Sequence, residues 1–321
     1  MQLRTQPILL HKCMHIDCEN YSPTYAQRFS QVLSEMRLLQ YNSDGEFSLT
    51  KDFVGGKIPE YAILSHTWGT DTEEVTYRDV IDRTGQNKIG YEKIRFCGEQ
   101  ARRDGLQYFW VDTCCIDKSH NIELQRSINS MFRWYRDSAK CYVFLADVPT
   151  ANVDTTGHCH RLPWESAFRR SRWFERGWTL QELIAPKSVE FFSKDCKLLG
   201  DKEALERYIC EITRIPSKAL RGSPLPTFSV AERMSWAETR KTTYEEDMVY
   251  SLLGIFDVYI SLIYGEGRGN AGGRLQEAID KKQKGALSSA TRIGYNYSKV
   301  INLGRDQIRG LFGPIQSLYS L

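Results

Sequence analysis

Glu182 has the sequence surroundings that most favour acid chemistry. We predict one helix over Ser171–Ala185, in which Trp178 and Glu182 lie four residues apart. Residues at that spacing share a helix face, so the indole would pack over the carboxylate. Exclusion of water by an indole raises the pKa of a carboxyl group and strengthens its field on a nearby cation. The pattern indicates a catalytic acid, or alternatively a buried structural carboxylate that caps backbone or pairs with Arg176.

The composition is that of an ordinary globular protein. The chain has 321 residues, of which 41% are hydrophobic and 26% charged, and its net charge of +3 is too small to indicate nucleic-acid binding. No apolar stretch is long enough to cross a bilayer, and the first residues lack a signal-peptide pattern. Nine cysteines in a chain of this length fit reduced thiols, so we expect a cytoplasmic protein.

The sequence predicts no metal site. Two adjacent cysteines, Cys114 and Cys115, lack a histidine at ligand spacing and are expected to be buried as small apolar side chains. Two further groups fit no standard zinc pattern: His11, Cys13, His15 and Cys18, and the segment 158–160.

Four apolar runs alternate with helical patterns. The runs are residues 61–66, 108–112, 141–146 and 189–192. Continuous apolar runs are typical of strands buried on both faces, and their alternation with helices predicts an α/β fold. We expect a flavodoxin-like parallel sheet flanked by helices. Ligands of such a sheet bind beyond the carboxyl ends of the strands, between the first and the third.

Changes of pattern divide the chain into four segments. Residues 1–35 form a weakly patterned extension, 36–200 the sheet domain, 201–280 a mostly helical lobe and 281–321 an unassigned tail. Residues 147–170, between the third strand and the next helix, exceed the usual length of such loops and are a candidate lid.

Three blocks of the sequence resemble the fungal HET (heterokaryon incompatibility) domain. They are YAILSHTWG at 61–69, WVDTCCIDK at 110–118 and RGWTLQELIAP at 176–186. The resemblance extends over about residues 36–280 and implies a role in non-self recognition and regulated cell death. It also implies activation by a homo-oligomer or by an upstream receptor-type protein.

HET domains are in turn remotely similar to TIR domains. The block Trp178–Leu183 resembles the Trp-Cys-Leu-x-Glu-Leu segment of plant TIR domains, whose glutamate cleaves NAD. By this similarity, Glu182 would be the catalytic residue of an NAD(P)-cleaving glycohydrolase, where a carboxylate stabilises an oxocarbenium-like centre. The alternative is a non-enzymatic death-signalling module that assembles, in which the same residues only hold the fold.

Other candidate nucleotide ligands lie where the predicted strands end. Gly69 permits close backbone approach, and Trp68 offers a stacking face or plugs the end of the sheet. Ser65 and His66 point to opposite faces and cannot form a dyad, so we expect His66 to line the site. We expect Asp112 to line the site or to cap a loop.

Two arginines and a tryptophan complete the predicted site. Arg172 and Arg176, four apart on the predicted helix, would hold a pyrophosphate bidentately, or form a solvated face that pairs with Glu175. Trp178 would lie beside the bound nucleotide.

Overall fold

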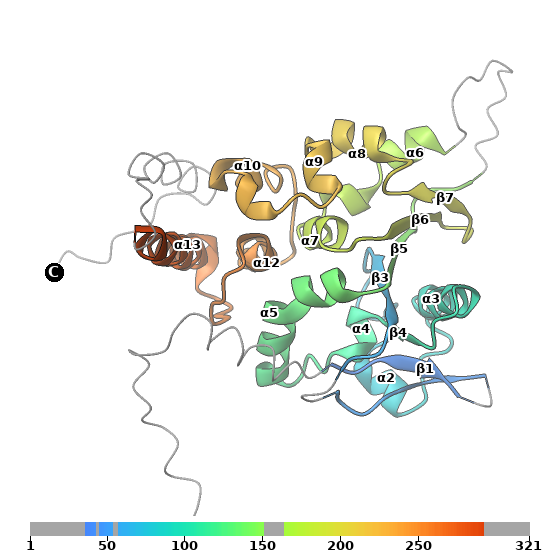
Figure 1. The fold of residues 1–321 in the computed structure, drawn as a ribbon. Helices are drawn as coiled ribbons and strands as arrows, with labels where there is room; N and C mark the ends of the chain where they lie inside the picture. Colours follow the sequence, from blue (N-terminus) through green and yellow to red (C-terminus); the bar gives the residue numbers. More distant parts are fainter. Residues whose placement is uncertain (1–35, 43–44, 54–56, 151–163, 292–321) are drawn as a thin grey trace, which may run out of the picture. The chain divides into compact units, whose positions relative to one another are not determined.

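The computed structural model describes residues 36–42, 45–53, 57–150 and 164–291 (Figure 1). The chain divides into two units. One comprises residues 1–36 and 52–58, and its described part pairs Met36 with Phe53 in an isolated antiparallel bridge. The other comprises residues 37–51 and 59–321 and holds all the helices and strands given below.

A seven-stranded sheet forms the centre of the larger unit, in the order β2-β1-β4-β3-β5-β6-β7. The strands are β1 (Leu39–Tyr41), β2 (Phe47–Leu49), β3 (Tyr61–His66), β4 (Tyr108–Trp110), β5 (Lys140–Leu145), β6 (Val189–Ser193) and β7 (Leu198–Asp201). The inner strands β4, β3, β5 and β6 are parallel, whereas β1, β2 and β7 pair antiparallel at the edges. The predicted α/β fold with a mainly parallel sheet is confirmed. The strand order reverses between β3 and β5.

Helices cover both faces of the inner strands, which explains their continuous apolar sequences. All six residues of β3 are buried. On β5, the rings of Tyr142 and Phe144 lie against Phe96 on one face. The neighbouring Cys141 points the other way, where its Sγ lies 3.9 Å from the carbonyl oxygen of Glu182. Because neither face of β3 meets water, its first four residues are apolar, whereas Ser65 and His66 at its end are buried polar residues.

The helices that follow the sheet strands in the chain include α3 (Tyr91–Arg103), α4 (Asp112–Cys115), α5 (Asn121–Asp137) and α7 (Thr179–Ile184). Shorter helices precede and separate them: α2 (Tyr77–Ile81), α6 (Glu165–Arg169) and the 3-10 turn η2 (Arg172–Glu175). The C-terminal part is mostly helical, as predicted, with α8 (Glu206–Thr213), α9 (Ser217–Leu220), η3 (Leu225–Thr227), α10 (Val230–Ser235), α11 (Asp247–Tyr250), α12 (Leu253–Phe256) and α13 (Gly267–Thr291). No helix in the described part of the chain has the length and apolar character needed to cross a bilayer.

The prediction of one helix over Ser171–Ala185 is wrong. The 3-10 turn η2 ends at Glu175, and Arg176 is extended, with φ −78° and ψ 139°. At Gly177 the backbone N–H donates to the carbonyl oxygen of Lys241 (2.8 Å). A Cβ on Gly177 would lie 2.5 Å from Cγ2 of Thr242, so only glycine admits this approach. Contact with a distant segment therefore breaks the helix before α7 begins.

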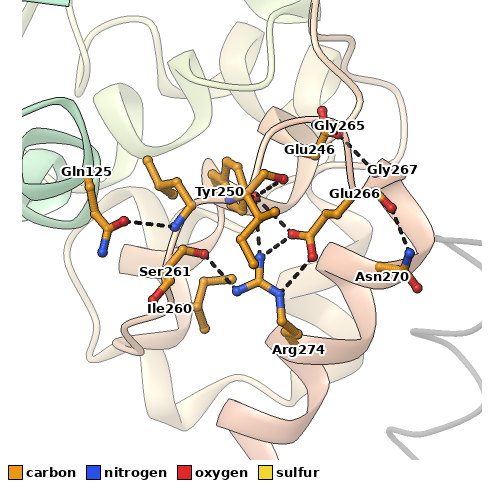
Figure 2. A network of polar contacts seen from close by, with 12 residues as sticks. Gln125, Glu246, Tyr250, Ile260, Ser261, Gly265, Glu266, Gly267, Asn270 and Arg274 are labelled. Atoms are coloured by element: carbon orange, nitrogen blue, oxygen red, sulfur yellow. Dashed lines mark hydrogen bonds and ion pairs between the residues drawn. The ribbon is translucent and has the colours of Figure 1, made fainter. Parts of the chain in front are cut away.

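A network of polar contacts holds the segment before α13 against α5 (Figure 2). Arg274 of α13 donates to the carboxylate of Glu266 and to the carbonyl oxygen of Ser261 (2.7 Å). On the other side, Gln125 of α5 accepts from the backbone N–H of Leu262 (3.3 Å). The buried face of α13 carries Ala271, Leu275 and Ile279. The predicted domain limits at 35, 200 and 280 stay predictions.

Candidate functional site

Glu182 lies buried at the carboxyl edge of the sheet, beside the end of β3. Its side chain on α7 belongs to a residue only 6% exposed, and its Oε2 accepts a hydrogen bond from the Ser65 hydroxyl (2.5 Å). Ser65 in turn accepts from the indole N–H of Trp173 (2.8 Å). An indole, a hydroxyl and a carboxyl group therefore form one buried chain of hydrogen bonds next to the strand-order reversal.

Burial raises the pKa of Glu182 to about 7. The negative charge of Asp112 adds to this rise, whereas the hydroxyls of Ser65 and Tyr135 and the charge of Arg176 oppose it. A carboxyl group that titrates near neutral pH can both donate and accept a proton under physiological conditions. The arrangement is chemically competent for acid–base work or for stabilising a developing cation.

The indole linked to Glu182 is that of Trp173, whereas the sequence pattern had assigned this place to Trp178. Trp178 precedes α7 and donates its indole N–H to Oδ2 of Asp247 (3.2 Å). Burial raises the pKa of Asp247, which also accepts from the Tyr264 hydroxyl (2.9 Å). Because the helix breaks at Arg176, Trp178 joins α7 to the C-terminal lobe.

Two buried cations fix the ends of α7. Arg240 donates to the carbonyl oxygen of Arg176 and to Oγ1 of Thr179, both at 2.8 Å. At the other end, Lys202 donates to the carbonyl oxygens of Leu183 (3.3 Å) and Pro186 (2.7 Å). Burial lowers the pKa of Arg240 to about 10 and that of Lys202 to about 8. These contacts set the orientation from which Glu182 reaches Ser65.

His66 points to the opposite face from Ser65, as predicted, and is buried between two carboxylates. Its Nε2 lies 3.7 Å from Glu74 and its Nδ1 lies 3.8 Å from Asp112. Burial would raise the pKa of Glu74, but hydrogen bonds and charges from His66 and Lys93 hold it well below its usual range. Glu74 also accepts from the backbone N–H of Gly69 (2.6 Å), so Gly69 closes the loop after β3.

Trp68 lies at the same edge with its side chain at the surface. The residue is 40% exposed, and its indole N–H donates to Oδ2 of Asp112 (2.8 Å). Nζ of Lys118 lies 3.7 Å from the centroid of the Trp68 ring, and Cζ of Arg176 lies 5.5 Å from it. Three predicted ligands therefore come together here, and Lys118 joins them although its sequence pattern did not single it out.

Arg172 does not share a helix with Arg176, so the predicted bidentate pair on one helix is wrong. The Arg172 side chain is 71% exposed and lies 3.7 Å from Asp147. Cys114 and Cys115 are free and buried, as expected for small apolar side chains. Burial raises the pKa of the Cys114 thiol well above its usual range.

Residues 61–161 match the family described as Heterokaryon incompatibility protein (HET). The chain is 60% identical over 246 residues to the vegetative incompatibility protein HET-E-1 of Podospora anserina. The chain therefore contains a region of the HET family. The aligned part is 77% of this chain and 18% of that relative, so the chain spans under a fifth of its length. No solved structure matches the chain significantly.

Several predicted features of this HET chain lie outside the described residues. They are the extension 1–35, the groups around His11–Cys18 and 158–160, and residues 151–163 of the candidate lid. The end of that loop forms α6. Sequence reasoning also passed over Arg240 and Tyr135, whose roles depend on contacts with residues far away in the chain.

Ser65→Ala is expected to raise the pKa of Glu182 further and to lower the free energy of unfolding of the HET chain by about 2 kcal/mol. The substitution leaves the Trp173 indole N–H and one Glu182 oxygen without their shared partner. Carbon-13 NMR titration of the carboxyl group and urea unfolding measure the two effects. Ser127→Ala, at a buried serine of α5, is the matched control. It should leave the Glu182 pKa unchanged and change the free energy of unfolding by at most about 0.5 kcal/mol. An unchanged Glu182 pKa in Ser65→Ala would contradict the assignment.

Proposed function

We propose that this HET chain acts in heterokaryon incompatibility as a cytoplasmic cell-death effector that cleaves NAD(P) at the nicotinamide–ribose bond, with Glu182 as the acting carboxylate. The single observation that supports this most is the buried Glu182, with a pKa raised to about 7, beside the strand-order reversal. The similarity to a vegetative incompatibility protein supports the biological role. Similarity of the Trp178–Leu183 block to plant TIR domains supports the reaction.

The proposed reaction adds water across the glycosidic bond and releases nicotinamide, a proton and ADP-ribose from NAD, or phosphorylated ADP-ribose from NADP. As the bond lengthens, positive charge develops on the ribose, and an ionised Glu182 beside it stabilises that charge. Nicotinamide leaves as a neutral ring because its nitrogen takes up the bonding electron pair. The ionised carboxylate can also take the proton of the attacking water. Ser65 orients the carboxyl group by donating to Oε2, and Arg240 orients α7.

The second candidate is a non-enzymatic death-signalling module that acts by assembly, either as a homo-oligomer or with an upstream receptor-type activator. One observation favours it: Oε2 of Glu182 already accepts the Ser65 hydroxyl inside the fold. Buried polar groups satisfied in this way also serve structure alone. The two candidates differ in what loss of the Glu182 charge does to a folded chain.

Glu182→Gln is expected to lower NAD cleavage at least about 100-fold while the chain remains folded, because an amide cannot stabilise a developing cation. Concentrated protein is incubated with NAD and with NADP, and mass spectrometry follows nicotinamide and ADP-ribose. Expression in fungal cells measures killing by the same variants. Glu175→Gln is the matched control, since Glu175 is a 57% exposed side chain at 3.6 Å from Lys241.

The outcomes separate the two candidates. Killing lost together with cleavage in Glu182→Gln supports the enzyme. Full killing by Glu182→Gln, with NAD and NADP untouched by concentrated wild type, leaves the assembly module as the function.

A further inference from the structure

The exposed indole of Trp68 is held in place between groups from three segments of the chain. Its N–H donates to Asp112, which follows β4, and this bond fixes the plane of the ring. Lys118 comes from the connection between α4 and α5, and Arg176 from the connection between η2 and α7. Segments separated by more than fifty residues therefore bring two cations to one aromatic ring at the carboxyl edge of the sheet.

Both cations keep their donors free. Through their side-chain nitrogen atoms, neither Lys118 nor Arg176 makes a hydrogen bond or ion pair with any residue that the structure describes. Arg169, by contrast, binds both Glu165 and Glu211. Burial lowers the pKa of Lys118; the charge of Asp112 opposes this shift, and the charge of Arg176 adds to it. Two mutually repelling, unpaired cations on one surface are typical of a site that an anion completes.

Two carboxylates act on Lys118 from nearby, Asp112 and Glu74, and each has a partner within the fold. Glu74 pairs with Lys93. One oxygen of Asp112 accepts the Trp68 indole N–H. Burial favours the neutral form of Glu182 up to about pH 7. The charge of Arg176 acts on Glu182 as well, which places Arg176 near the proposed catalytic carboxyl group.

We propose that Lys118 and Arg176, both beside the Trp68 indole, form a subsite for the pyrophosphate of a dinucleotide. The inference rests on the proposed function and specifies its substrate class: a pyrophosphate-linked nucleotide and not a nucleoside. Arg176 presents a planar fork that matches two phosphate oxygens, whereas the Lys118 ammonium supplies a mobile point charge. An anion between them releases Lys118 from the ring face, and the exposed indole then stacks on a base or on nicotinamide. Lys118 takes the place that the sequence pattern had given to Arg172.

The test measures binding to the Glu182→Gln variant, so that ionisation of Glu182 does not affect the measured affinities. Calorimetry compares ADP-ribose, inorganic pyrophosphate and adenosine on the full chain. Lys118→Met and Arg176→Met are each expected to weaken ADP-ribose binding about 10-fold, equivalent to about 1.4 kcal/mol. Arg172→Met, which removes an exposed cation four residues from Arg176, should change binding less than twofold. Inorganic pyrophosphate should compete with ADP-ribose, and higher salt should weaken both.

Several results would overturn the subsite. One is tight ADP-ribose binding by a folded variant that carries both Lys118→Met and Arg176→Met. Another is the absence of measurable ADP-ribose binding by the Glu182→Gln protein without these changes. A third is adenosine binding that depends on Lys118 and Arg176 as strongly as ADP-ribose binding does. Lys118 is exposed, so Lys118→Met alone decides the question should Arg176→Met fail to fold. Binding that depends on the pair in a protein that never cleaves NAD would overturn only the proposed reaction. If NAD cleavage requires Glu182 but ADP-ribose binding does not change on substitution of Lys118 and Arg176, only this subsite is overturned.

Discussion

Gly254→Ala is expected to lower the free energy of unfolding by about 4 kcal/mol, the upper end for a single overpacking change. Gly254 lies on α12, where that helix crosses α5. A Cβ built on it would lie 2.0 Å from Cβ and 2.3 Å from Cγ of Phe132. These are not the flexible end of the Phe132 side chain, so no rotamer change relieves the contact. The two helices have to move apart, and a close-packed interface loses contacts along its length.

Gly285→Ala is the matched control, because Gly285 is also a helical glycine. Nothing lies within 4 Å of a Cβ built at Gly285 on α13. Alanine there should leave stability unchanged or raise it by up to about 1 kcal/mol through helix propensity. Urea unfolding followed by circular dichroism measures both variants. Similar free energies for the two would show that α12 does not pack on α5 as described.

The effect should extend to the candidate site because α5 also carries Tyr135. The Tyr135 hydroxyl donates to the carbonyl oxygen of Leu64 (3.0 Å), one residue before Ser65. Displacing α5 to accommodate the methyl group added at Gly254 would therefore disturb the strand that orients Glu182. The C-terminal lobe and the site are parts of one packing arrangement, although they lie far apart in sequence.

Local sequence was sufficient to predict the four parallel strands of the sheet, but it missed the antiparallel edge strands β1, β2 and β7. The run at residues 61–66 is the whole of β3, and its first four residues are apolar because the strand is buried on both faces. Residues 108–112 were predicted as a strand, but β4 ends at Trp110 and α4 begins at Asp112. The polar Asp112 therefore starts a helix at the edge of the sheet, where its carboxylate can meet Trp68.

The candidate site could be predicted only in part. Burial of Glu182 followed from its apolar neighbours, but the wrong tryptophan was assigned to it. A helical period continues through residue 177, and nothing nearby reveals that Thr242 approaches Gly177 too closely for any side chain. The bond from Trp173 to Ser65 spans 108 residues, and that from Arg240 to Thr179 spans 61. Such contacts depend on tertiary packing, which periodicity does not encode.

Glu182 is expected to make the wild type lose stability as pH rises from 4.5 to 7, by an amount on the order of 3 kcal/mol. In the unfolded chain the group ionises at its ordinary pKa of 4.5, whereas in the folded chain burial raises the pKa to about 7. Between these values the folded state holds a proton that the unfolded state has released. Stability is then highest below pH 4.5, falls through the window, and is level above pH 7 as far as this group is concerned.

The difference between wild type and Glu182→Gln isolates this contribution, because glutamine fills the same volume and does not titrate. Other shifted groups are present in both proteins and cancel in the difference. The pKa of Glu74 lies below the window and that of Lys202, at about 8, lies above it, whereas Asp247, whose pKa burial also raises, contributes in the same direction as Glu182. Urea unfolding at half-unit steps from about pH 4.5 to about pH 8 gives both curves, with Glu175→Gln expected to follow the wild type. Parallel curves for wild type and Glu182→Gln would mean that Glu182 ionises at the same pH in both states. A carboxyl group of that kind has no special capacity for proton transfer near neutral pH, and the catalytic assignment would lose its physical basis.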